Sequence, residues 1–293
     1  MIDSGSLRVA VHVHADVGES PSWDARAAVL RFVDMSRGIV YRHDPADGSL
    51  SSCEVGQEVG AVVVREAGGI AAAVRDGIGF VDEATGALEL IAPIELDLPG
   101  NRMNDAKCDP AGRLWAGTMS FDFTAGAGSL YRVLPDHSFT RVVENVTISN
   151  GLGWSPDGDR MYYTDTAAGS IDVFDFELAT GEVANRRRLL DFAPGDGMPD
   201  GLAVDAEGHI WVALFGGGCI RRYTPGGLLV DRIELPVSQP TSVAFGGDGL
   251  HDLYITTATY QLTAEQLAEQ PLAGATFVCR PGVTGVPVQS FGG

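Results

Sequence analysis

A hairpin pattern that recurs six times along the chain constrains the fold more than any other feature. Each copy has a short strand, a tight turn and a second short strand, as in AKCDPAGRLWAGT, LGWSPDGDRMYYTD and LAVDAEGHIWVAL. The turn positions are spaced 41, 44, 46, 50 and 41 residues apart, which is near the period of a four-stranded propeller blade. These positions are Ala27, Gly68, Gly112, Gly158, Gly208 and Gly249.

A second hairpin usually follows each copy, as in GSLYRVLPDHSF and GCIRRYTPGGLLV. Two hairpins make one blade, so the sequence predicts an all-β, six-bladed β-propeller that occupies residues 1–293 as a single domain. The remaining apolar segments, 7–15 and 275–282, are expected to pair and close the ring within one blade. The best helical pattern is the short LTAEQLAEQ segment at 262–270.

Charge and cysteine spacing exclude several classes of function. The net charge of −19 would repel the phosphate backbone of nucleic acids and anionic membrane surfaces. No run of about 18 apolar residues and no secretory leader pattern is present, so we expect a soluble, cytoplasmic protein. The four cysteines form no C-x-x-C pair, which favours buried free thiols over a zinc site or a disulfide framework.

Oxygen-bearing side chains recur at one offset in these repeats. In a propeller the innermost strands surround the axis, so equivalent positions on them form a ring. The positions eight residues before the turns are Glu19, Gly60, Asn104, Asn150, Asp200 and Thr241. Carboxylate and amide oxygens without His or Cys predict one hard divalent cation such as Ca²⁺, Mg²⁺ or Mn²⁺.

Simpler interpretations of individual residues remain open at this stage. Asn150-Gly151 and Asp200-Gly201 are also common turn dipeptides. His12 and His14 share one strand face, and we expect them on a half-exposed edge strand. The four tryptophans recur at matching positions around the turns, which favours core packing between blades. The chain has neither a G-x-S-x-G nor a G-x-x-x-x-G-K-[ST] motif, so serine-hydrolase and NTP chemistry lack their usual signatures.

Long motifs spread over nearly the whole chain carry a family resemblance. NRMNDAKCDPAGRLWAGTMS, ISNGLGWSPDG and PDGLAVDAEGHIWVALFGGG resemble the regucalcin (senescence marker protein 30), gluconolactonase and luciferin-regenerating enzyme-like family. The resemblance implies a six-bladed propeller that hydrolyses sugar lactones with a divalent metal at one channel end. It places the metal ligands at Glu19, Asn150 and Asp200, substrate binding at Arg102 and Asn104, and the proton acceptor at Asp200.

One position departs from that family pattern. Where regucalcin has two adjacent glutamates after the GTM motif, this chain has Phe121 and Asp122, and Asp122 is expected to replace the second carboxylate in substrate binding. Asp105 is expected to orient Asn104. Ca²⁺ is the first choice of ion, with Zn²⁺, Mn²⁺, Mg²⁺ or Fe²⁺ as alternatives. An organophosphate or other ester hydrolase, or a non-catalytic calcium-binding propeller, are the competing functions.

Overall fold

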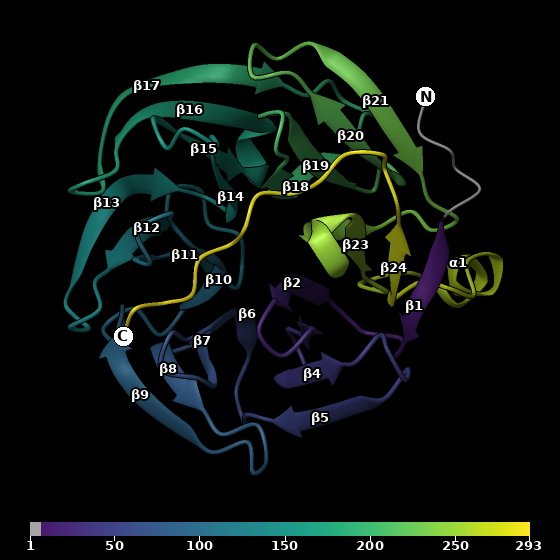
Figure 1. The fold of residues 1–293 in the computed structure, drawn as a ribbon, viewed down its shortest axis with the longest axis horizontal. Coiled ribbons are helices and arrows are strands. Elements are labelled where there is room, and N and C mark those ends of the chain that lie inside the picture. The colour runs from purple at the N-terminus through teal and green to yellow at the C-terminus, as the bar shows by residue number, and fades with distance from the viewer. Residues whose placement is uncertain (1–6) are drawn as a thin grey trace.

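The computed structural model describes residues 7–293, which form six four-stranded antiparallel sheets arranged around a common axis (Figure 1). The predicted six-bladed β-propeller is therefore confirmed. The blades are numbered in chain order, and the strands of each blade are given from the axis outward: blade 1 consists of β2 (Gly18–Asp24), β3 (Val29–Asp34), β4 (Ile39–His43) and β5 (Leu50–Glu54), and blade 2 of β6 (Val59–Val64), β7 (Ile70–Val74), β8 (Gly77–Val81) and β9 (Leu88–Pro93). Blade 3 consists of β10 (Asn101–Cys108), β11 (Leu114–Ser120), β12 (Gly128–Val133) and β13 (Phe139–Val146), and blade 4 of β14 (Ser149–Trp154), β15 (Arg160–Asp165), β16 (Ser170–Glu177) and β17 (Glu182–Asp191). Blade 5 consists of β18 (Met198–Val204), β19 (Ile210–Phe215), β20 (Cys219–Tyr223) and β21 (Leu229–Glu234), and blade 6 of β22 (Pro240–Gly246), β23 (Asp252–Thr257), β24 (Ala275–Cys279) and β1 (Arg8–His12).

The first and last strands of the chain pair in blade 6, as the sequence predicted. β1 pairs antiparallel with β24, with Arg8 opposite Val278, so an N-terminal strand completes a sheet built from C-terminal strands. This pairing closes the ring and leaves no blade incomplete. His12 is exposed on this outermost strand and lies 4.1 Å from His14 between ring centroids, which agrees with the expected edge strand.

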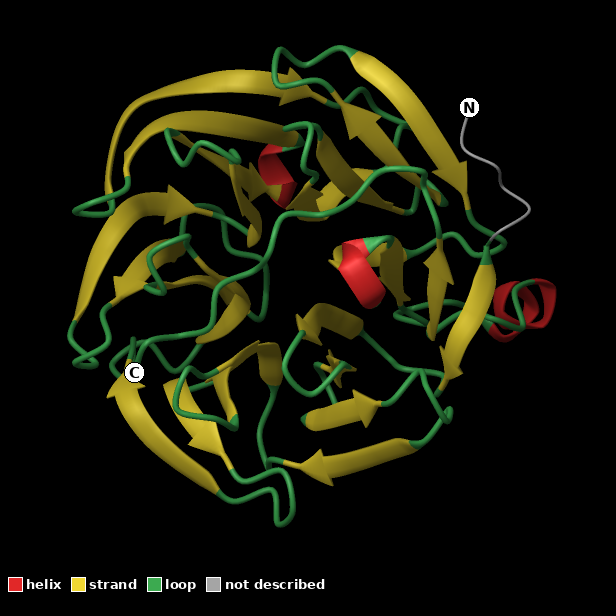
Figure 2. Cartoon of the chain, in the orientation of Figure 1, coloured by secondary structure: helices red, strands yellow, loops and turns green. Residues whose placement is uncertain are grey.

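Helices contribute little to the structure (Figure 2). The predicted helix forms as α1 (Ala264–Glu269), where Thr263 and Gln266 make a reciprocal capping box at its start. Two short 3-10 turns, at 166–168 and 248–250, complete the helical content of residues 7–293. No helix within this described range is long and apolar enough to cross a membrane.

Turn chemistry explains why the first hairpin of each blade reverses where it does. Gly112, Gly158 and Gly208 have φ of +77°, +70° and +82°, a left-handed conformation in which side chains with a Cβ are strained. In blade 1 the left-handed residue is Ala28 with φ of +54°, one position after the predicted turn residue Ala27. The register of the hairpin survives this shift because β2 and β3 still pair from Asp24 opposite Val29.

A buried aspartate at the end of the inner strand ties two of these hairpins to their own blades. Asp205 is completely buried and its Oδ2 accepts hydrogen bonds from Trp211 Nε1 at 2.9 Å and Arg222 Nε at 2.8 Å. Asp109 occupies the same position in blade 3 and accepts from Trp115 Nε1 at 3.0 Å. The recurring D-x-x-G turn followed by Trp is therefore a structural motif.

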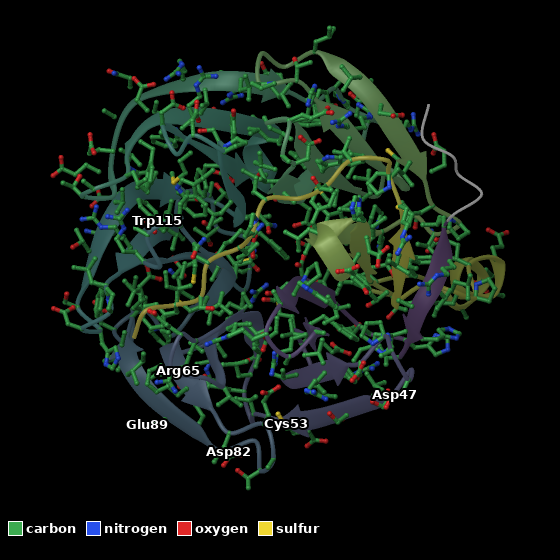
Figure 3. All side chains as sticks on the ribbon, in the orientation of Figure 1. Asp47, Cys53, Arg65, Asp82, Glu89 and Trp115 are labelled. Atoms are coloured by element: carbon green, nitrogen blue, oxygen red, sulfur yellow. The ribbon has the colours of Figure 1, made fainter. Side chains whose placement is uncertain are left out.

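The hydrophobic core lies between the blades. Trp115 from blade 3 is fully buried and lies 6.2 Å from Trp154 of blade 4 between ring centroids, while Trp23 of blade 1 stacks on Tyr254 of blade 6 at 5.8 Å. These contacts confirm that the tryptophans pack between blades. Figure 3 shows Trp115 inside the disc, while Asp47 and Glu89 lie toward its rim.

Candidate active site at one end of the channel

Each of the six inner strands carries a bulge at the ring position predicted from the sequence. In every blade the inner strand has one more residue than its partner strand between two consecutive paired positions, for example between Met103 and Ala106 in β10 and between Pro199 and Leu202 in β18. Bulges re-aim side chains and commonly occur beside active sites. In blade 3 two consecutive residues, Asn104 and Asp105, are both buried at this bulge.

Two ring carboxylates, together with the adjacent Asp105, are buried within electrostatic reach of one another. Burial raises the pKa of Glu19 well above its usual range, and the charges of Asp200 and Asp105 raise it further. The pKa of Asp200 is likewise raised by burial and by Asp105. Like charges gathered in a buried place are unfavourable unless a cation neutralises them. Glu19 and Asp200 are therefore close enough for their charges to interact, and their role as metal ligands stays a prediction.

Several polar atoms at the ring lack a hydrogen-bond partner. Asn150 Oδ1 and Asp200 Oδ1 are both buried and accept no hydrogen bond from the described residues. Asn150 Nδ2 donates to Thr166 Oγ1 at 3.1 Å, and that hydroxyl donates to Pro199 O at 2.7 Å, so the amide is held with its oxygen free. Buried polar groups are usually satisfied, so these two oxygens are candidates to bind a cation.

The oxygen atoms at the ring are the ligands that hard cations prefer. A metal site here cannot be built from titratable side chains alone. Within residues 7–293, no group of three His, Cys, Asp or Glu side chains is arranged to hold a metal. A cation bound here would need the neutral amide oxygen of Asn150 beside the carboxylates of Glu19 and Asp200. Oxygen ligands of mixed charge suit Ca²⁺ or Mg²⁺.

Asn104 and Arg102 form a hydrogen-bonded unit on blade 3. Arg102 Nη1 donates to Asn104 Oδ1 at 2.7 Å and to Met103 O at 2.9 Å, and Asn104 Nδ2 donates to Ser149 O at 2.8 Å. Both ends of the Asn104 amide therefore make hydrogen bonds within the protein, and its oxygen retains one further lone pair. The guanidinium also lies 5.9 Å from the centroid of the Phe121 ring.

Burial and nearby acids compete in setting the pKa of Arg102. Burial lowers it to about 10, while Glu58, Glu19 and the Tyr260 hydroxyl favour the charged form. At neutral pH the guanidinium therefore stays protonated. Arg102 interacts with Glu58 from blade 2, Glu19 from blade 1 and Tyr260 from the loop after β23, so residues of three other blades act on the charge of its guanidinium.

Asp105 is buried, and its nearest opposite charge is that of the half-buried Lys107. Its Oδ1 accepts from the backbone N–H of Ala106 at 2.8 Å, and the described residues show no bond from it to Asn104. Lys107 Nζ donates to Leu202 O at 2.6 Å. Burial raises the pKa of Asp105 and lowers that of Lys107, while their opposite charges oppose both shifts. The orientation of Asn104 rests on Arg102 and Ser149.

Asp122 lies apart from these groups. It is exposed on the loop after β11, where Oδ1 accepts from the Thr124 hydroxyl at 2.7 Å and from the Thr124 backbone N–H at 3.1 Å. Hydrogen bonds from Thr124 and Ser120 lower the pKa of Asp122. Phe121, its neighbour, is the loop residue that reaches Arg102. A substrate role for Asp122 stays a prediction.

Two polar residues at the site were not identified from the sequence. Glu58 and Gln239 each lie two residues before a ring position, the same offset that separates Arg102 from Asn104. Applying that offset to every repeat would have found both. Gln239 Nε2 donates to Tyr260 O at 2.9 Å, and its Oε1 is buried without a partner among the described residues.

The far side of the ring opens into a separate cavity of about 270 Å³. Trp23, Trp154 and Phe245 line it, and Asp105 and Lys107 reach it from the side of the ring. The segment 286–289 covers this cavity and belongs to the C-terminal stretch that crosses the inner strands in Figure 1. Asp105 and the half-buried Lys107 thus contribute charged groups to the lining of a mainly apolar cavity.

Comparison with known proteins places these residues in context. The model of the SMP-30/Gluconolactonase/LRE-like region matches residues 17–259. Regucalcin from Danio rerio is 40% identical over 282 residues, covering 95% of each chain. The 6-deoxy-6-sulfogluconolactonase from Pseudomonas putida is 37% identical over 289 residues, covering 98% of this chain and 99% of the relative. The crystal structure of a calcium-binding protein, regucalcin from Agrobacterium tumefaciens, superposes with a TM-score of 0.93 at 31% identity, covering 97% of this chain and 96% of that one.

Proposed function

The chain belongs to the SMP-30/gluconolactonase/LRE-like family, and from this premise we propose that it hydrolyses a sugar lactone to the aldonic acid with the help of one divalent cation. The names of two relatives support this substrate class, since one is a 6-deoxy-6-sulfogluconolactonase and another structural relative is described as a gluconolactonase. The observation that carries the proposal is the pair of orphaned oxygens, Asn150 Oδ1 and Asp200 Oδ1, buried beside Glu19.

Glu19, Asn150 and Asp200 are the residues that would hold the cation. Two carboxylates would neutralise a divalent ion, and the amide of Asn150 would add a ligand without adding negative charge. A bound cation supplies a Lewis acid that polarises the lactone carbonyl and stabilises the negative charge that develops on it. Ca²⁺ is the ion we expect first, because the structural relative from Agrobacterium tumefaciens is described as a calcium-binding protein.

The chain's own residues orient the substrate. Only Nη1 of Arg102 is engaged by the hydrogen bonds found among the described residues, to Asn104 and to Met103. The planar guanidinium therefore retains donors for sugar hydroxyls or the ring ester, which the ammonium of a lysine would not match in geometry. The bond to Asn104 and its onward bond to Ser149 O fix the direction in which Arg102 points.

Asp200 is the residue that moves the proton. Its carboxylate takes a proton from the attacking water as the water oxygen bonds to the lactone carbonyl carbon. The bond from that carbon to the ring oxygen then breaks, and the proton passes from the Asp200 carboxyl group to the departing ring oxygen, which becomes a hydroxyl. One water is consumed for each lactone opened, and Asp200 is regenerated in its carboxylate form.

Chelation tests the cation and the reaction separately. Hydrolysis of D-glucono-1,5-lactone, corrected for the spontaneous reaction, should be lost in chelator and return with added Ca²⁺ or another divalent ion. At a free ion concentration of about 100 times Kd, binding should stabilise the fold by about 2.7 kcal/mol. Over a chain of 293 residues this raises Tm by about 4 °C.

Two variants and a control show where the ion binds. Glu19→Gln and Asn150→Ala should each abolish the ion-induced rise in Tm, whereas Asp47→Asn, an exposed acid near the rim in Figure 3, should retain both the rise and the activity. Full turnover after chelation would disprove metal dependence. A rise in Tm with ion, combined with no hydrolysis of any sugar lactone, would instead support a non-catalytic calcium-binding propeller.

A further inference from the structure

A second layer of residues lies two positions before the ring in each repeat, at the start of the inner strand or immediately before it. Side chains two residues apart on a strand point to the same side, so this layer should border the ring toward the open end of the channel. Only three of its members are polar, and these are Glu58, Arg102 and Gln239. The complete layer comprises Val17, Glu58, Arg102, Ile148, Met198 and Gln239.

Glu58 and Arg102 are brought together by the close contact between blades 2 and 3. A Cβ built at Gly60 would lie 2.0 Å from the backbone oxygen of Asn104, so the two inner strands touch at the ring itself. Glu58 and Arg102 occupy matching positions, each two residues before this contact. The negative charge of Glu58 acts on the guanidinium accordingly.

Glu58 is not engaged by a strong partner elsewhere. Its Oε2 is buried and has no hydrogen bond among residues 7–293. Arg75 Nη1 lies 3.8 Å from this oxygen, but Arg75 pairs more closely with Asp76, at 3.1 Å. The Glu58 side chain is 31% exposed, and among the described residues Oε2 makes only this long ion-pair contact, so it keeps the capacity to accept a hydrogen bond from a ligand. A sugar hydroxyl can donate that bond.

The charged side chains around the site have no excess positive charge that could attract an anionic substrate. The carboxylates that act on Arg102 or on the ring outnumber the two cations, Arg102 and Lys107. A divalent cation would bring the total only to neutrality. The four carboxylates are Glu19, Glu58, Asp105 and Asp200.

We propose that Glu58 is a specificity-determining residue that accepts a hydrogen bond from a sugar hydroxyl and restricts the site to uncharged polyhydroxy lactones. The proposal rests on the lactonase function and narrows it. A sulfonate, phosphate or carboxylate on the substrate would be repelled by the carboxylate of Glu58. The same carboxylate offsets the positive charge of Arg102, which would otherwise attract such a group. In this respect the chain should differ from its relative that is named for a sulfonated lactone.

Paired substrates measure this discrimination. D-glucono-1,5-lactone serves as the neutral probe and 6-deoxy-6-sulfo-D-glucono-1,5-lactone as the anionic one. The wild-type protein should favour the neutral lactone in kcat/KM. Glu58→Gln, which keeps the shape and removes the charge, should raise the relative kcat/KM for the anionic lactone about tenfold, the effect of one charge at about 8 Å and an effective dielectric constant of about 30.

A matched control lies in the same blade. Glu89 is exposed on the outermost strand β9 and lies toward the rim in Figure 3, so Glu89→Gln should leave the ratio unchanged. The wild-type preference should also shrink in 1 M salt, where charges are screened within about 3 Å. A Glu58→Gln ratio equal to the wild-type ratio would overturn the proposal.

Ligand binding without turnover separates this proposal from the lactonase assignment. The thermal shifts produced by D-glucose and 6-deoxy-6-sulfo-D-glucose report ring-sugar binding, and Glu58→Gln should raise the shift for the sulfonated sugar selectively. If both sugars shift wild type and variant alike, charge selection by Glu58 is wrong whatever the activity. If the selective shift is present but no lactone is hydrolysed, the lactonase assignment alone fails.

Discussion

Two buried aspartates of blade 5, only five residues apart, should respond in opposite ways to the same Asp→Asn substitution. Asp205 is fully satisfied, because Oδ1 accepts from the backbone N–H groups of Glu207 and His209 while Oδ2 accepts from Trp211 and Arg222. In Asp200 the Oδ1 atom has no hydrogen-bond partner among the described residues. Asp205 should therefore stabilise the fold, and Asp200 should take part in the reaction.

The cost of Asp205→Asn follows from its bonds. The new amide N–H₂ in place of Oδ2 would face two donors, Trp211 Nε1 and Arg222 Nε, so two hydrogen bonds are lost. A bond to a charged group contributes about 1.5 to 3 kcal/mol, and breaking a buried ion pair costs about 3 to 5 kcal/mol. With an unfolding entropy of about 0.6 kcal/mol/K for 293 residues, Tm should fall by about 5 to 8 °C.

Asp200→Asn should lower activity without lowering Tm. Removing a charge that burial and Asp105 both disfavour should leave the Tm of the metal-free protein unchanged or higher, while hydrolysis falls about 10² to 10⁴-fold. Calorimetry on metal-free samples and lactone hydrolysis on metal-loaded samples measure the two effects. If Asp205→Asn abolishes activity in the folded protein, or Asp200→Asn lowers Tm as much as Asp205→Asn does, the division of roles is refuted.

The remaining predictions concern pH and close contacts between blades. Glu19 and Asp200 have folded-state pKa values above the usual 4.5 and 3.8, so the folded state holds protons more tightly than the unfolded chain. The Tm of the metal-free protein should thus rise as pH falls from 8 toward about 5.5, and a steady fall in a melting series would contradict this. Gly151→Ala should lower Tm by about 2 to 5 °C, because its Cβ would lie 2.5 Å from Asp200 O, and overpacking costs about 1 to 3 kcal/mol. Gly100→Ala, where the added Cβ meets nothing within 4 Å, is the matched control, and equal melting of the two variants would refute the steric argument.

The sequence by itself determined the architecture and the ring. Six hairpins at nearly constant spacing predicted six blades, and a constant offset from each turn selected six ring positions, among which the metal ligands Glu19, Asn150 and Asp200 stay a prediction. The prediction of the blades succeeds because turns and strand alternation depend on residues close together in the chain, so each repeat specifies its own hairpins. The pairing of the first strand with the last followed from the same repeat count.

The tertiary structure decided which of these side chains remain available for chemistry. The amide oxygen of Asn104 accepts from Arg102, two residues away, but its amide nitrogen donates to Ser149 of the next blade. The substrate role expected for Asn104 stays a prediction. The charge of Glu58 acts on Arg102 of a different blade, which the offset alone does not reveal. The contacts of Asn104 with Ser149 and of Glu58 with Arg102 join residues far apart in the chain, and they exist only once the ring has closed and brought neighbouring inner strands together.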